Sequence, residues 1–271
     1  MNDRKLNLII GWICFLISFI VYYLTAEPTV GFWDTGEYIT TSAKLQVGHP
    51  PGAPLYQMLG AIFSIFAFEK ENIGFTMNLM SGFASALAIS FMYWSIILIL
   101  KKITDTSEAS INKQILISGS ALVGSLAFAF TDTFWFSAVE TEVYAMATLI
   151  MAVIFYLGLR WEADMHNSRG DKWLLLICFV IGLSFGVHFM GLLVIPAIVM
   201  IYYFKNQKTI LNSTKLNPII GFFIANIIGL AILMGVFKLL LPNTLKFFSA
   251  IELLFVNNLG LPFNSGTLVA F

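Results

Sequence analysis

The feature that most constrains this chain is a series of long apolar runs. The first, Leu6–Leu24, contains 19 residues and no charged side chain. A helix of about 20 apolar residues is long enough to cross the hydrocarbon core of a bilayer. Of the 271 residues, 58% are apolar and 11% are charged, whereas a soluble domain carries about 25% charged residues. The sequence therefore predicts an all-α fold, a polytopic membrane helix bundle.

Further apolar runs define the rest of the predicted bundle. We expect an uncleaved first helix, although a charged start before an apolar run also resembles a signal peptide. We expect residues 1–271 to form a single transmembrane domain, and the end just after an outer loop leaves open that this is the N-terminal part of a longer protein. The later helices are expected at Phe75–Leu100, Gln114–Phe130, Phe136–Leu159, Trp173–Phe189, Leu192–Phe204 and Pro218–Leu241, with a further apolar stretch at Phe247–Val256.

The loop predicted between the first two spans, residues 26–72, holds the polar residues of the N-terminal half. Asp34–Val47 has an amphipathic helical pattern and is too polar to cross a bilayer, which is typical of a helix lying in the interface. The sequence GHPPG at 48–52 breaks this helix. Ala53–Phe68 is apolar but marginal in length for a span. We therefore expect two interfacial helices in the first outer loop.

The distribution of basic residues predicts the orientation. If Ala53–Phe68 does not cross the membrane, eleven Lys and Arg residues fall on one side and four on or near the other; if it crosses, this bias disappears. Cytoplasmic loops carry the excess of Lys and Arg, so we expect a cytoplasmic N-terminus. The outer face then holds the acidic residues Glu27, Asp34, Glu37, Glu69, Glu71, Asp132, Glu140, Glu142 and Glu252.

Under this topology, polar residues from distant parts of the sequence reach the outer face together. We expect them to border one polar cavity that opens outward, a common arrangement where ionisable residues occur in membrane proteins. The candidate site residues are Asp34, Glu37, His49, Glu140, Glu142, Tyr144, His188 and Asn257.

The acidic candidates also have structural interpretations. Residues 34–37, DTGE, fit a capping box with Asp34 as N-cap and Glu37 reaching back, which is compatible with a catalytic role for Asp34. Glu140 and Glu142 fit acids at the start of a helix, where the helix dipole favours them. Because residues two apart lie on different sides of a helix, we expect only one of these two to face the cavity.

The histidines have structural alternatives as well. His188 lies near the end of its predicted helix, where a lone histidine is more often a satisfied structural group. Gly182 and Gly186, in the same segment, predict a close contact between helices. His49 precedes two prolines and also fits a residue that orients the turn.

Several function classes are disfavoured by what the chain contains. Its formal net charge of zero argues against nucleic-acid binding. Cys14 and Cys178 both lie in apolar runs, so we expect free thiols and no metal site built on cysteine. The sequence has no Walker loop, Rossmann fingerprint or HExxH motif. A donor substrate must then be reachable from the membrane or from the outer side.

Five segments carry a resemblance to a known family: Gly31–Glu37, Gly48–Gly52, Phe134–Tyr144, Gly186–His188 and Phe255–Pro262. The first loop resembles the first outer loop of the GT-C superfamily of membrane glycosyltransferases. The chain more closely resembles a domain-of-unknown-function family of bacterial membrane proteins, to which a vertebrate transmembrane protein O-mannosyltransferase is related. The segments follow in order over nearly the whole chain, which makes the resemblance specific. GT-C membrane domains generally have more helices than this chain supplies.

The resemblance implies a hexosyltransferase in the bacterial inner membrane. It would move a sugar such as mannose from a polyprenyl-phosphate donor to a hydroxyl acceptor, a protein Ser or Thr, on the outer face. Asp34 is then the general base, and Glu37 orients Asp34 or the acceptor. The implied partners are the lipid-linked donor, the acceptor polypeptide and membrane lipid. The scattered acids permit a divalent metal without requiring one. The remaining candidates bind substrate: Glu140 and Glu142 at the sugar or acceptor, His49 and His188 at the phosphate, with Tyr144 and Asn257.

The alternative is a transporter or lipid carrier with an outward acidic cavity. Acids at the middle of the membrane and broken helices would indicate such a carrier. The predicted acids gather at one surface, which favours the enzyme. A structural scaffold is a third interpretation.

Overall fold

The computed structural model of the chain describes residues 3–104 and 111–270, and within these ranges every regular element is helical. Five helices are long and apolar enough to cross a membrane, and a sixth span results if a bent pair counts as one. The predicted all-α, polytopic fold is thereby confirmed. The chain divides into two compact units, Met1–Val194 and Ile195–Phe271.

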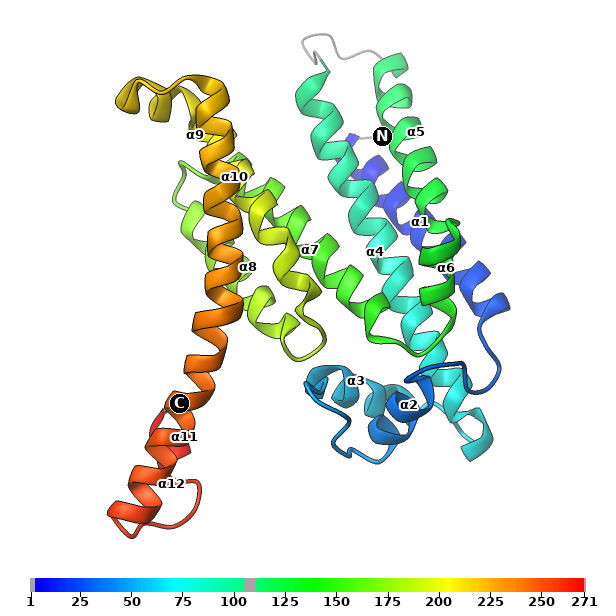
Figure 1. The fold of residues 1–271 in the computed structure, drawn as a ribbon. Helices are drawn as coiled ribbons and strands as arrows, with labels where there is room; N and C mark the ends of the chain where they lie inside the picture. Colours follow the sequence, from blue (N-terminus) through cyan, green and yellow to red (C-terminus); the bar gives the residue numbers. More distant parts are fainter. Residues whose placement is uncertain (1–2, 105–110, 271) are drawn as a thin grey trace. The chain divides into compact units, whose positions relative to one another are not determined.

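Helix α4 (Ile73–Ile103) is the central helix of the first unit. It packs against α1 (Asp3–Thr25), α5 (Ile111–Ala129) and α7 (Val143–Asp164) (Figure 1). Its buried positions are rich in Gly, Ala and Ser. Such small residues let helices approach closely in a membrane, where packing rather than exclusion of water drives their association.

Hydrogen bonds join the same helices. The Asn7 side chain on α1 accepts from the hydroxyls of Tyr93 at 3.0 Å and Ser118 at 2.9 Å. The Ser90 hydroxyl of α4 donates to the carbonyl oxygen of Gly11 at 2.9 Å. Because all these groups are buried, the bonds fix the positions of α4 and α5 along α1.

The segment between α1 and α4 folds as α2 (Thr35–Ala43), α3 (Pro54–Ser64) and the short η1 (Lys70–Asn72). Helices of 9 and 11 residues are too short to cross a bilayer. In Figure 1 both lie at the end of the unit where α1 ends and α4 begins. This agrees with the expectation that neither Asp34–Val47 nor Ala53–Phe68 forms a span.

The first turn of α3 is held by the segment that follows α8 (Gly170–Ser184). The N–H groups of Leu55 and Tyr56 donate to the carbonyl oxygen of Gly186, at 2.7 and 3.1 Å. A Cβ added to Gly186 would lie 2.7 Å from the Leu55 Cβ, whereas a Cβ added to Gly182 would have no atom within 4 Å. The prediction of a close helix contact is therefore wrong for Gly182, and the absence of a side chain at Gly186 allows α3 to approach.

The region predicted as one helix, Phe136–Leu159, is broken. Helix α5 bends by 66° into α6 (Asp132–Val139), and α7 begins at Val143. Between them, Glu140 and Glu142 have the φ and ψ angles of extended backbone. The single-helix prediction is wrong here because apolar content alone cannot show where the backbone leaves the helix.

Ionisable side chains lie at both ends of the first unit. At the end where α1 begins and α4 and α7 finish, Lys101 pairs with Asp3 and Lys102 pairs with Glu162. The acidic candidate residues lie at the opposite end, beside α2 and α3. Which end faces the cytoplasm stays a prediction.

The second unit begins with α9 (Ile195–Thr214), against which α10 (Pro218–Gly235) packs. From Pro218 the helical run continues to Asn258 through two π-helical turns, so Phe247–Val256 belongs to the same run as α10. The first of these turns, at 236–240, ends two residues before Pro242, which cannot donate a backbone hydrogen bond. Helices α11 (Leu241–Leu253) and α12 (Ser265–Ala270) complete the unit; the Glu252 carboxylate accepts from residues 264 and 267.

Candidate functional site

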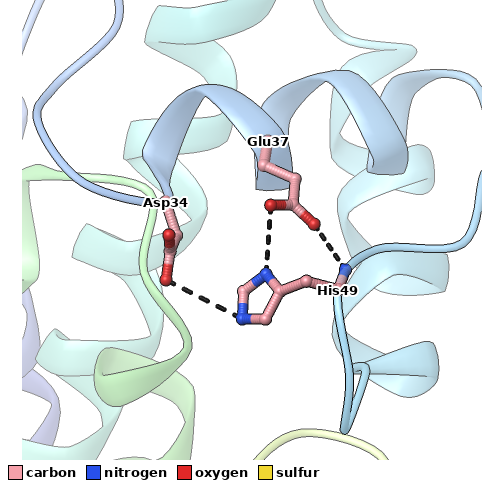
Figure 2. A group of neighbouring side chains, drawn as sticks. All are labelled: Asp34, Glu37 and His49. Carbon is pink, nitrogen blue, oxygen red and sulfur yellow. Dashed lines mark hydrogen bonds and ion pairs between the residues drawn. The ribbon is translucent and has the colours of Figure 1, made fainter.

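Three side chains of the first loop meet at the N-terminal end of α2 (Figure 2). The Glu37 carboxylate accepts from the backbone N–H of His49 at 2.6 Å and lies 3.0 Å from its Nδ1. The other ring nitrogen, Nε2, lies 3.9 Å from an Asp34 carboxylate oxygen. Asp34 is the N-cap residue of α2 but makes no side-chain capping bond. The capping-box interpretation is therefore wrong, and Glu37 holds His49 instead.

This arrangement sets the charge of the imidazole. Hydrogen bonds from His49 lower the pKa of Glu37, and the same contact raises the pKa of His49. The charge of Asp34 adds to the rise in the pKa of His49. The imidazole therefore favours its protonated form more than an isolated histidine does.

The backbone before Asp34 is unusual. Trp33 has φ of +58°, in the left-handed region that bulky residues rarely adopt, and its side chain is 90% exposed. This conformation turns the chain immediately before α2. Trp33 and Asp34 both line a cavity of about 640 Å³ in the first unit. Strained backbone of this kind is most often found at functional sites.

The extended segment 140–142 explains why both acids reach the cavity. In extended backbone, alternate side chains point to the same side. Glu140 and Glu142 both line the cavity, and Thr141 points away, fully buried. The expectation that only one of the two acids faces the cavity is wrong, because it assumed a helix.

Asn78 of α4 fixes this segment in place. Its side chain is fully buried and accepts from the Thr141 hydroxyl at 2.5 Å. Its amide group donates to the carbonyl oxygens of Glu27 at 2.6 Å and Thr29 at 3.0 Å. One side chain thus joins the loop before α2 to the segment before α7. Sequence reasoning missed Asn78, although an asparagine inside an apolar run is a visible signal.

Burial sets the protonation of the two acids. It is the main cause that raises the pKa of Glu142 from 4.5 to about 7, and the neighbouring charge of Asp34 adds to it. Burial also raises the pKa of Glu140. A Cβ on Gly31 would lie 2.8 Å from the carboxyl carbon of Glu140, so the missing side chain gives this carboxyl its space. A carboxyl with a pKa near neutral pH can take up and release protons there.

Two cavities adjoin at these residues. The larger has a volume of about 640 Å³ and is lined by Asp34, Glu140 and Glu142 together with aromatic side chains. The smaller has a volume of about 120 Å³ and is lined by Asp34, Glu142 and both imidazoles, His49 and His188. Asp34 and Glu142 therefore border both cavities.

Two further aromatic groups complete the smaller cavity. The ring of Tyr144, which lines both cavities, contacts His188 edge-on with centroids 5.4 Å apart. His188 accepts from the Met190 N–H through Nδ1 at 3.2 Å, and burial lowers its pKa, so the neutral ring carries its proton on Nε2. Tyr38 also lines the smaller cavity, and the sequence analysis did not predict it as a site residue. Burial is the main cause that raises the pKa of Tyr38 to about 12, and the charge of Glu142 adds to the rise.

The structure thus brings together seven of the eight predicted site residues. The eighth, Asn257, lies in a π-helical turn of the second unit.

Asp34, Glu37 and His49 also have the donor set for a divalent cation. Each offers one ligand atom, and the three atoms lie within 4.8 Å of one another. Carboxylate oxygens with one imidazole nitrogen suit ions such as Mn²⁺ or Zn²⁺. The residues therefore fit the divalent metal that the sequence permits.

Comparison with known proteins agrees with this geometry. A family model described as "Protein O-mannosyl-transferase TMEM260 N-terminal domain" matches residues 34–211, a range that includes Asp34 and His188. The Protein O-mannosyl-transferase tmem260 of Dictyostelium discoideum is 24% identical over 229 residues, which cover 80% of this chain and 26% of that protein. The Protein O-mannosyl-transferase TMEM260 of Mus musculus is 27% identical over 167 residues, which cover 60% of this chain and 21% of that protein.

The alignments thus cover about a quarter of the length of these relatives. No solved structure matches the chain significantly. Because the family model covers well over half of the sequence, the chain belongs to the family of the protein O-mannosyl-transferase TMEM260 N-terminal domain.

Proposed function

We propose that the chain acts as a membrane glycosyltransferase that moves a hexose such as mannose from a polyprenyl-phosphate donor to a Ser or Thr hydroxyl of a protein on the outer face. The names of its relatives support sugar transfer to protein. The observation that carries the proposal is the position of Asp34. Asp34 borders the smaller cavity, which is also lined by two imidazoles, and the larger cavity, which is also lined by two further carboxyls.

The two cavities suit the two halves of the reaction. The smaller, at about 120 Å³, has room for a phosphate group, and its imidazoles can donate hydrogen bonds to phosphate oxygens. The larger, at about 640 Å³, has carboxyls for sugar hydroxyls and aromatic side chains for an acceptor segment. The reacting bond would then lie at their shared wall, beside Asp34.

Each residue has a defined part in the transfer. An Asp34 oxygen takes the proton of the acceptor hydroxyl as its oxygen attacks the anomeric carbon of the sugar. The bond from that carbon to the phosphate oxygen breaks, and its electron pair stays on the leaving polyprenyl phosphate. The protonated ring of His49 and the Nε2–H of His188 stabilise the charge on that phosphate. Glu37 fixes the ring of His49 through two contacts.

A divalent cation held by Asp34, Glu37 and the neutral ring of His49 would replace the proton of that ring and would supply positive charge beside the phosphate. Such an ion would occupy an oxygen lone pair of Asp34, and Asp34 needs a free lone pair to accept the proton of the acceptor hydroxyl. The steps above therefore use only side chains of this chain.

The carrier alternative receives less support from the geometry. Asp34 and Glu142 are N-cap residues and Glu140 is a C-cap residue. These three acids lie beside α2 and α3, at the end of the first unit where α1 ends and α4 begins, whereas coupling sites of carriers lie near the middle of the membrane. The 66° bend between α5 and α6 is a broken helix that a carrier would also have.

Transfer of radiolabelled mannose from a polyprenyl-phosphate lipid to a Ser/Thr peptide tests the proposal in membranes that contain the chain. We expect transfer by the wild type, loss of transfer in Asp34→Asn, and unchanged transfer in Glu69→Gln, which alters an exposed acid of the same loop. Equal transfer by wild type and Asp34→Asn would remove Asp34 as the base. Uptake of a solute without any sugar transfer would favour a carrier.

A further inference from the structure

A second cavity with its own chemistry lies at the basic end of the first unit, far along the helices from α2 and α3. It has a volume of about 290 Å³ and is bordered by α1, α4 and α7. The cationic side chains Arg4, Lys101 and Arg160 line it, one from each of these helices. No part of the proposed sugar transfer uses this cavity.

The lining has two layers. Residues four apart lie on the same face of a helix, about one turn apart along its axis. One turn further into the bundle than the three cations lie Leu8 on α1, Ile97 on α4 and Tyr156 on α7, and all three line the cavity. A cationic layer at the helix ends is thus backed by an apolar and aromatic layer.

The walls of the cavity are held by defined contacts. The indole Nε1–H of Trp94 donates to the carbonyl oxygen of Asn7 at 3.2 Å, and both residues line the cavity. Arg160 lies over the ring of Trp173, 5.4 Å from its centroid, with one face of its guanidinium engaged there. Asp3 pairs with Lys101 and also accepts from the Asn7 side chain. Among the described residues that line the cavity, three are cationic and none is acidic.

We propose that this cavity binds the phosphate headgroup of an anionic membrane phospholipid, with its glycerol and first acyl carbons against the apolar layer. α1, α4 and α7 are all candidate membrane spans, so a cavity at their ends lies at headgroup depth. Basic pockets between spans on the cytoplasmic side bind anionic headgroups, and tryptophan and tyrosine favour that depth. A free phosphate ion would satisfy the cationic layer but leave the apolar layer exposed to water.

Native mass spectrometry of the chain in mild detergent tests this proposal with equal amounts of phosphatidylglycerol and phosphatidylcholine. We expect one phosphatidylglycerol to be retained in preference to phosphatidylcholine. A contact between one lining cation and the lipid phosphate contributes about fivefold in affinity, so Arg4→Gln with Arg160→Gln should weaken retention about 25-fold. Arg169→Gln with Lys172→Gln removes the same charge from exposed positions at the same end and should leave retention within about twofold.

A second variant distinguishes a loss of lipid binding from a folding defect in the double variant. Leu8→Trp keeps every charge, and its position is already 52% exposed, so the larger ring fills the cavity without entering the core. We expect it to reduce phosphatidylglycerol retention while the circular dichroism spectrum and elution volume stay those of the wild type.

Three outcomes would overturn the proposal. They are equal retention of the two lipids by the wild type, an equal loss in the Arg169/Lys172 control, and full displacement of phosphatidylglycerol by inorganic phosphate. The last would show an anion site that does not recognise lipid. Because retention is measured without sugar transfer, this test and the test of the proposed function can fail independently.

Discussion

Glu142→Gln should stabilise the chain in a way that depends on pH. Burial and the charge of Asp34 raise the pKa of Glu142 from 4.5 to about 7 in the folded chain. The folded state then binds the proton more tightly than the unfolded state does, so stability falls as the pH rises from 4.5 to 7 and stays lower above that. The glutamine has no proton to lose, and this penalty is absent from the variant.

The size of the effect follows from the difference between the pKa values of Glu142 in the folded and unfolded chain. One pKa unit corresponds to 1.36 kcal/mol, so the rise from 4.5 to about 7 gives an upper bound of about 3.4 kcal/mol between the two protonation states. Because the Glu142 side chain is partly exposed, solvent screening reduces this to about 1.5–2 kcal/mol. We therefore expect the variant to exceed the wild type by about that amount at pH 8.5 and to match it near pH 4.5.

Unfolding by sodium dodecyl sulfate in mixed micelles, followed by circular dichroism between pH 4.5 and 8.5, measures this difference. Glu69→Gln, at an exposed acid of the same loop, should follow the wild-type curve. Asp34→Asn should move the pH-dependent fall to lower pH, because the like charge that raises the pKa of Glu142 is gone. Parallel curves for wild type and Glu142→Gln would refute the placement of Glu142 in a poorly solvated cavity beside Asp34.

Two further predictions concern the fold around the site. Thr141→Val should destabilise the chain by about 1–3 kcal/mol, since it leaves the buried Asn78 oxygen without this donor; Thr141→Ser keeps the hydroxyl and should recover most of the loss in the same unfolding assay. A membrane-impermeant maleimide should label Val47→Cys, at a position 94% exposed, from the outer side of intact cells but not Ser168→Cys, both in a Cys178→Ser background. The reverse pattern would invert the predicted orientation.

The apolar runs predicted most of the membrane helices because length and hydrophobicity identify a span. The run Trp173–Phe189 is an exception: its helix, α8, ends at Ser184, and its 15 residues are not among the candidate spans. The first loop was predicted almost as well. Its two acids and His49 are close in sequence, and the turn at 48–52 returns the chain towards α2. The partner of Glu37 was not predicted, because residues 34–37 also fit a capping box and the sequence does not show that His49, 12 residues after Glu37, returns to it. Only the folded loop distinguishes the two.

The break before α7 could not be predicted from local sequence. Residues 140–142 carry no proline or glycine to end a helix. Their extended backbone is held by Asn78, which lies 63 residues from Thr141 in the chain. This contact forms only when α4 and α7 pack together. The presence of both Glu140 and Glu142 in one cavity therefore depends on tertiary structure.

The rate of sugar transfer by Asp34→Asn tests the central claim most directly. A general base acts in the transition state and contributes about 10²–10⁴-fold. We therefore expect kcat to fall at least about a hundredfold while the KM for the polyprenyl-phosphate donor changes little, with folding unchanged by circular dichroism. A variant that keeps the wild-type kcat, or that loses only donor binding, would contradict the assignment of Asp34 as the proton acceptor between the two cavities.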